Sequence, residues 1–121
     1  MSIASYIVNF ETVISSNSFV SSYSFTIGRK TRDIAFIEFR NGTVLDFKEF
    51  IESKELVVDK YIYGYNYRRG RTIIFRYDNA PDPRSRQLRT YPHHKHLPPD
   101  KLVDFDRLID LPAVLDEIEG I

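Results

Sequence analysis

The sequence predicts an α+β fold, a curved five-stranded antiparallel meander sheet with an N-terminal helix and a short C-terminal helix. Apolar residues recur at helical spacing at both ends of the chain and alternate with polar residues between positions 19 and 78. Nine Phe and eight Tyr, against no Trp, also favour strands. With 121 residues, 42% of them hydrophobic, the chain is predicted to form one domain, 1–121, around one core.

The two predicted helices lie at the ends of the chain. Residues 2–14 carry one apolar helical face, and Ser2 is suited to cap it. The face consists of Ile3, Tyr6, Ile7, Phe10, Val13 and Ile14. The C-terminal helix is predicted over Leu111–Ile118, where Pro112 suits the first turn.

Five strands are predicted between the helices, over residues 19–27, 34–40, 44–51, 57–67 and 72–78. Asn41-Gly42 predicts a hairpin with a two-residue type I′ turn, because both residues tolerate a positive φ. Gly70 supplies another turn. Since short connections join consecutive strands, they are expected to pair in chain order.

Residues 80–99 differ from the rest of the chain. They hold five prolines, four Arg or Lys residues and all three histidines. Proline cannot donate to a strand ladder, so the segment is predicted to be a long basic loop with room for one short edge strand. Loops of this length in compact domains are often functional.

The formal net charge of zero hides an uneven distribution. Residues 1–53 carry −1, residues 54–97 carry +6 and residues 98–121 carry −5. Seven arginines fall between positions 68 and 89. Such a basic region attracts nucleic acid or an acidic protein surface.

Several classes of function are disfavoured. The absence of cysteine excludes disulfides, thiolate metal sites and a cysteine nucleophile. No secretion signal and no apolar run of about 20 residues is present, which predicts a cytoplasmic protein without a membrane partner. Glycine-rich phosphate loops, zinc-protease motifs and nucleophile elbows are also missing.

Four tyrosines alternate along one predicted strand and share one face: Tyr61, Tyr63, Tyr65 and Tyr67. Packing against the helices is one interpretation, since strands collect aromatic residues. The functional alternative is a platform on which bases stack beside a basic edge. Gly64, on the other face, is expected to allow the close approach of another backbone.

The next strand ends in Arg76 and Asp78, which share a face. They form either a structural ion pair or a site in which the Arg76 guanidinium binds phosphate. Farther along, His94 and His96 point to one side of an extended segment, and His93 and Lys95 to the other. With Asp78, His94 and His96 could hold zinc or manganese. We favour acid–base chemistry without a metal or other cofactor, because histidine titrates near neutral pH.

Three strings resemble a known family: YGYNY at 63–67, GRTIIFRYDNAP at 70–81 and TYPHHKH at 90–96. They are similar to the TumE-type toxins of bacterial and archaeal toxin–antitoxin modules, and the resemblance covers most of residues 30–119. It implies a small intracellular toxin neutralised by a helix-turn-helix antitoxin. The residues that carry over are Tyr63, Tyr65, Tyr67, Arg76, Tyr77, Asp78, Asn79, Pro92, His93, His94 and His96.

The sequence departs from the family pattern at two places. Asn66 or Gly64 stands where the family often has a histidine between tyrosines. Asp82-Pro83 stands where it often has His-His. Any role that those histidines have in the family is therefore either absent from this chain or carried by other residues.

Together these features predict a ribonuclease toxin that needs no metal. Its predicted catalytic residues are His94, His96, Arg76, Asp78 and Lys95. Substrate binding is assigned to Tyr63, Tyr65, Tyr67, Tyr77, Asn79, His93, Arg86 and Arg89. Predicted partners are RNA and the antitoxin, in a homodimer or a toxin–antitoxin complex. The alternatives are a non-catalytic module whose basic loop docks an acidic partner, including the chain's own acidic tail, and a metal-dependent nuclease.

Overall fold

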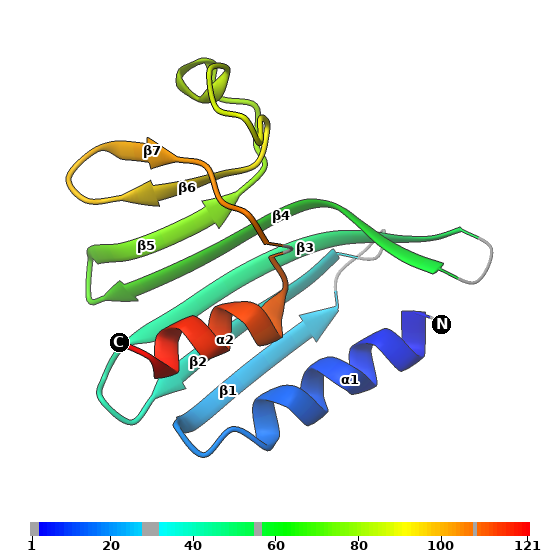
Figure 1. The fold of residues 1–121 in the computed structure, drawn as a ribbon. Coiled ribbons are helices and arrows are strands. Elements are labelled where there is room, and N and C mark those ends of the chain that lie inside the picture. Colours follow the sequence, from blue (N-terminus) through cyan, green and yellow to red (C-terminus); the bar gives the residue numbers. More distant parts are fainter. Residues whose placement is uncertain (1–2, 28–31, 55–56, 108) are drawn as a thin grey trace.

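A computed structural model describes residues 3–27, 32–54, 57–107 and 109–121. The chain forms one seven-stranded antiparallel sheet, in which neighbouring strands follow each other in the sequence (Figure 1). The elements are, in order, α1 (Ile3–Ser15), β1 (Val20–Ile27), β2 (Arg32–Phe39), β3 (Val44–Lys54), β4 (Val57–Arg69), β5 (Thr72–Asp78), the 3-10 turn η2 (Pro83–Ser85), β6 (His94–Leu97), β7 (Lys101–Val103) and α2 (Leu111–Glu119).

The α+β class, the antiparallel meander and both terminal helices are confirmed, but the predicted number of five strands is wrong. The two additional strands, β6 and β7, begin within or just after the segment predicted as a loop. Its prolines flank β6 instead of interrupting it, so all the backbone N–H groups of this strand remain available. β6 is an inner strand, because β7 pairs with its outer side.

The hairpin between β2 and β3 also differs from the prediction. Phe39 N donates to Thr43 O at 2.9 Å, and Gly42 N donates to Phe39 O at 3.0 Å. Three residues therefore lie between the closing pair, instead of two. Gly42 supplies the positive φ, at 84°, as the three-residue hairpin requires.

Both helices cover the same face of the sheet (Figure 1). This face forms the core, because the strands alternate and turn their apolar residues towards the helices. Buried residues from the strands include Ile37, Phe39, Leu45, Phe47, Tyr63, Tyr65, Tyr67, Phe75 and Tyr77. Phe10 and Ile14 of α1 and Leu111, Val114, Leu115 and Ile118 of α2 pack against them. Within the described residues, neither α-helix lies on the opposite face.

The amino end of α2 is fixed by a side-chain cap. Asp110 precedes the helix, and its Oδ1 accepts a hydrogen bond from Ala113 N at 2.9 Å. Such a cap satisfies one of the backbone N–H groups that lack a partner within the helix. It fixes the point at which the chain, after crossing the sheet from β7, starts to cover the core.

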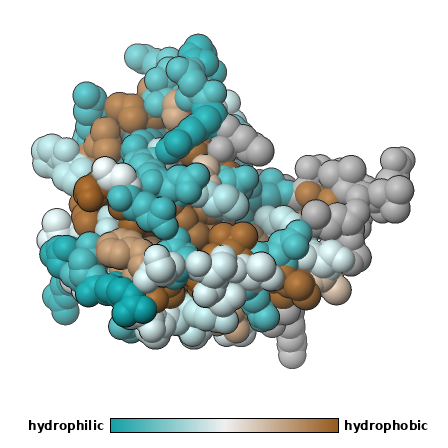
Figure 2. Space-filling view, turned by 60° about the horizontal axis from the view of Figure 1, so that its bottom comes forward, coloured by the Kyte–Doolittle hydropathy of each residue, from teal (hydrophilic) through white to brown (hydrophobic). Residues whose placement is uncertain are grey.

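Seen from below the view of Figure 1, hydrophobic residues form separate areas among hydrophilic ones (Figure 2). Neither helix of the described residues has the length and apolar character of a membrane span.

Substitutions on the buried and the exposed side of α1 test how much the packing of its buried side contributes to stability. The Ile14 side chain is fully buried, whereas Val8 is 59% exposed. We expect Ile14→Ala to lower the free energy of unfolding by about 2–5 kcal/mol, because it leaves a cavity. Val8→Ala should change it by less than about 0.5 kcal/mol. Urea titration followed by circular dichroism measures both, and equal losses would contradict this packing.

Candidate active site

Asp78 and two histidines meet where β5 pairs with β6. The register places His94 opposite Asp78 and His96 opposite Arg76. Directly opposed residues of an antiparallel pair project from the same face, so all four side chains lie on the face that neither α1 nor α2 covers. His94 Nε2 lies 2.9 Å from Asp78 Oδ1, and His96 Nε2 lies 3.1 Å from Asp78 Oδ2.

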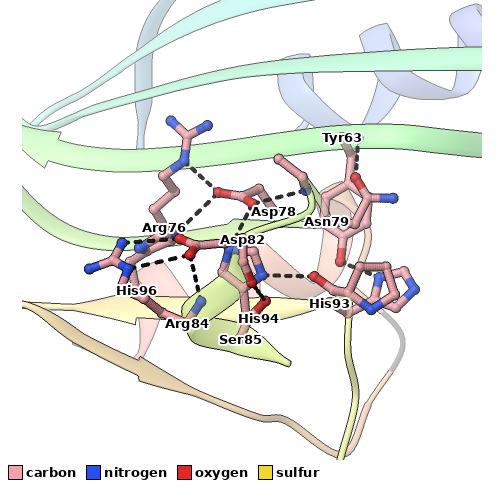
Figure 3. A network of polar contacts seen from close by, with 12 residues as sticks. Tyr63, Arg76, Asp78, Asn79, Asp82, Arg84, Ser85, His93, His94 and His96 are labelled. Carbon is pink, nitrogen blue, oxygen red and sulfur yellow. Dashed lines mark hydrogen bonds and ion pairs between the residues drawn. The ribbon is translucent and has the colours of Figure 1, made fainter. Parts of the chain in front are cut away.

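The Asp78 carboxylate is only 4% exposed and has four hydrogen-bond partners (Figure 3). Besides the histidines, Arg76 Nε donates to Oδ2 at 2.8 Å and Ala80 N donates to Oδ1 at 3.1 Å. Each oxygen thus has two partners, which is close to the capacity of an ionised carboxylate. The buried charge is therefore compensated by hydrogen bonds and by the adjacent guanidinium.

His94 is 1% exposed, and both of its ring nitrogens face oxygen atoms. Nδ1 lies 2.7 Å from Pro92 O, while Nε2 faces Asp78. Because a carbonyl oxygen can only accept, Nδ1 carries a hydrogen. The buried His94 therefore positions the cluster and does not reach solvent.

Of the two histidines that contact Asp78, His96 is the one that faces solvent, with 27% of its side chain exposed. Its Nε2 donates to Asp78, which leaves Nδ1 to act as a base. Burial lowers the pKa of His96 below its ordinary value, although Asp78 opposes the shift. The imidazole is therefore held neutral and in one orientation, as a general base requires.

A cavity of about 480 Å³ opens beside His96. Arg71, Arg76 and Lys101 contribute positive charge to its lining, and Asp100 is the one acidic residue there. Asp100 accepts a hydrogen bond from Arg84 at 2.7 Å, so its charge is already paired. The cavity thus favours an anion such as a phosphate group.

Gly64 leaves the space that the Arg76 side chain uses. A Cβ atom at this position would lie 3.3 Å from Arg76 Nη2 and 3.9 Å from Asp78 Cβ. The expected approach of another backbone at Gly64 is therefore wrong, because the nearest group is the Arg76 guanidinium.

Asp78, His94 and His96 have ligand atoms within 4.8 Å of one another, and a set of two histidines and one carboxylate suits zinc. The Arg76 guanidinium, whose Nε lies 2.8 Å from Asp78 Oδ2, would repel a cation bound at this carboxylate. In the structure, the histidine nitrogens and the carboxylate oxygens are within hydrogen-bond distance of each other.

Lys95 and Tyr77 lie on the helix-covered face, opposite the cluster. The Lys95 ammonium group donates to Glu117 of α2 at 2.8 Å, and Tyr77 OH donates to the same carboxylate at 2.6 Å. Lys95 therefore does not share a phosphate with Arg76 in this fold. These contacts attach α2 to the sheet.

The other tyrosines are core residues. Tyr63, Tyr65 and Tyr67 are 4%, 0% and 2% exposed, so none of these rings offers a face to a base. The packing interpretation of the row holds for them, and the stacking platform does not form. The side chain of Tyr61 lies outside the described part.

The remaining predicted substrate residues lie around the chain that leads to β6. Asn79 Oδ1 accepts from Tyr63 N at 3.0 Å. The Tyr63 hydroxyl and His93 Nδ1 are 2.8 Å apart. Arg86 is exposed, and Arg89 pairs with Asp104 and Asp106.

The acidic tail thus neutralises part of the basic loop. Arg84 pairs with Asp100, and Arg89 with Asp104 and Asp106. The chain's own tail, one of the acidic partners considered from the sequence, occupies these arginines.

The sequence interpretation missed Lys60, Glu49 and Lys101. Lys60 contacts the fully buried Glu49 at 3.6 Å. The sequence did contain an indication for Glu49. It lies two residues after Phe47, on the strand face that also carries the apolar residues Leu45 and Phe47. Lys101 gave no signal, because only the β6–β7 turn brings it to the cavity.

Searches of curated proteins and of solved structures found no significant match to this chain. A family model described as Toxin TumE matches residues 10–121. This range includes the Asp78 cluster, the residues that line the cavity beside His96, and α2. The chain therefore belongs to the TumE toxin family.

Proposed function

We propose that this protein is the toxin of a toxin–antitoxin module and that it cleaves RNA, without a metal ion, at the cluster of Arg76, Asp78, His94 and His96. One observation carries the proposal. A partly exposed histidine, oriented by a buried carboxylate, lines a cavity together with three cationic side chains. Membership of a toxin family supports the biological role.

In the proposed reaction, His96 Nδ1 takes the proton from an RNA 2′-hydroxyl. The 2′ oxygen attacks the adjacent phosphorus, and the bond from phosphorus to the 5′ oxygen breaks. That oxygen takes a proton from water, and the hydroxide formed takes the proton back from His96, which returns the imidazole to its neutral form. The products are a 2′,3′-cyclic phosphate and a 5′-hydroxyl, so atoms and charge balance without a metal.

The cations act on the phosphate group. Arg76 and Arg71 present planar guanidinium groups that match phosphate oxygens, and Lys101 adds a third charge. Charge that develops on the phosphorane is stabilised by groups already in place, which is commonly a large contribution to catalysis. Asp78 and His94 act through His96 and Arg76, as positioning residues.

The proposed partner is an antitoxin of the helix-turn-helix type, and the proposed location is the cytoplasm. Both follow from the toxin family, whose members inhibit growth unless they are neutralised. The reading frame next to this gene tests the assignment, because it should encode a small helix-turn-helix protein.

The first test is cleavage of a single-stranded RNA by the purified protein. We expect His96→Ala to slow cleavage by about 10²–10⁴-fold, the usual contribution of a general base. Arg40→Gln, an exposed charge change at the far hairpin, should cleave like the wild type. Gel analysis with and without EDTA measures both. Loss of activity on chelation would show that the metal-free mechanism is wrong. Full activity of His96→Ala would show that His96 is not the general base.

The pH profile is the second test. His96 works as a base only when neutral, so the rate should fall as pH drops through its pKa. Because burial lowers that pKa, the acidic midpoint should lie below 6.5. Single-turnover cleavage between pH 4.5 and 8 measures it, and a midpoint above 6.5 would contradict the assignment.

Gly64→Ala provides a third test, since it acts on Arg76. The added methyl group should displace the guanidinium and reduce cleavage by about tenfold or more. The gain from replacing glycine inside a strand opposes the loss of the Arg76–Asp78 contact, so the variant should still fold, which circular dichroism checks. Gly120→Ala is the control, since its Cβ would meet nothing nearer than 3.6 Å. Unchanged cleavage in Gly64→Ala would mean that Arg76 does not need its observed position.

A further inference from the structure

A second cavity, of about 400 Å³, lies on the opposite side of the sheet from the Asp78 cluster. It is bounded by β4, the chain before β6 and the connection from β7 to α2, which passes over the helix-covered face (Figure 1). Successive residues of an extended chain point to opposite sides. His94 therefore faces the Asp78 cluster, whereas the neighbouring His93 lines this second cavity.

Three cations line this cavity, Lys60, Arg89 and Arg107, together with the carboxylate of Asp106. Arg89 pairs with Asp104 and Asp106, and Arg107 pairs with Glu117, so a bound phosphate would share or take over contacts that these carboxylates now make. The two guanidinium groups are exposed, and Lys60 lies deeper, with 14% of its side chain exposed. Lys60 is held in place, because its ammonium group donates to Tyr65 OH at 2.9 Å and to Ile109 O.

The cavity also offers aromatic surfaces. The His93 ring is exposed and lies nearly parallel to the buried Tyr63 ring, at 5.7 Å between centroids. Phe105 is half-buried and packs edge-on against Tyr77. The loop that carries His93 is closed by two hydrogen bonds, since His93 N donates to Thr90 O and Thr90 Oγ1 donates to His93 O. His93 is thus positioned before any ligand binds.

Cations at the rim combined with fixed aromatic rings are the features that bind nucleotides in single-stranded RNA. We propose that this cavity binds one nucleotide of single-stranded RNA, apart from the cleaved phosphate, with its base against His93 and Phe105 and its phosphate at Arg89 and Arg107. The inference rests on the proposed function for its substrate. It adds a binding site that is separate from the proposed site of cleavage.

An RNA that cannot be cleaved tests this site independently of catalysis. The probe is a fluorescent single-stranded oligonucleotide of eight 2′-O-methyl nucleotides, which lacks the attacking hydroxyl. Its binding to the full chain is followed by anisotropy. We expect Arg89→Gln and His93→Ala each to weaken binding about tenfold, in line with the loss of one phosphate contact or one stacked base. Both residues are exposed, so the variants should fold, and circular dichroism checks this.

Arg40→Gln is the matched control for the loss of one charge, and it should bind the probe as the wild type does. Equal affinity of Arg89→Gln, His93→Ala and the control would overturn the proposal, as would failure of the wild type to bind the probe. Binding that depends on Arg89 and His93 in a protein that cleaves no RNA would support this site while refuting the proposed nuclease. Cleavage with unchanged binding in both variants would do the opposite.

Discussion

The arrangement of the site depends on one buried carboxylate. Asp78 accepts hydrogen bonds from two histidines, one arginine and one backbone N–H group, and these come from β5, β6 and the chain after β5. A buried charge is tolerated only with such compensation. The same contacts therefore hold β6 in register, fix the guanidinium of Arg76 and orient His96. Stability and the proposed chemistry share this one group, so the chain cannot exchange its partners without loosening the sheet.

Strand alternation was enough to predict part of the site from sequence. It places His94 and His96 on one side and Lys95 on the other, as the structure has them, and it puts Arg76 with Asp78. It also grouped Tyr63, Tyr65 and Tyr67 correctly on one face. Periodicity cannot tell what covers a face, however, and here two helices bury the tyrosines. The short strands β6 and β7 escaped prediction because four and three residues carry little periodicity, and pairing with β5 stabilises them.

The basic loop and the acidic tail, whose charges cancel in the total, contact each other in the structure. The acidic carboxylates at positions 100, 104 and 106 pair with Arg84 and Arg89 of the preceding chain. These pairs are exposed, so each contributes little to stability. They do shape the local field, since they reduce positive charge around the loop and leave Arg71, Arg76 and Lys101 together at the cavity beside His96. The two cavities lie on opposite sides of the sheet, and a rigid duplex is poorly suited to reach both. For the proposed RNA substrate, this geometry favours a flexible single strand.

The order of the strands in the meander affects how the protein folds. Every strand pairs only with strands next to it in the sequence, so the sheet contains no crossover that must wait for a distant segment. Topologies dominated by such local pairings generally fold fast. During synthesis, the early hairpins can form first, and the histidines of β6 join the sheet only after β5 is in place. α2, which is made after all seven strands, then covers the core. The order of synthesis therefore delays assembly of the candidate site until the rest of the sheet exists.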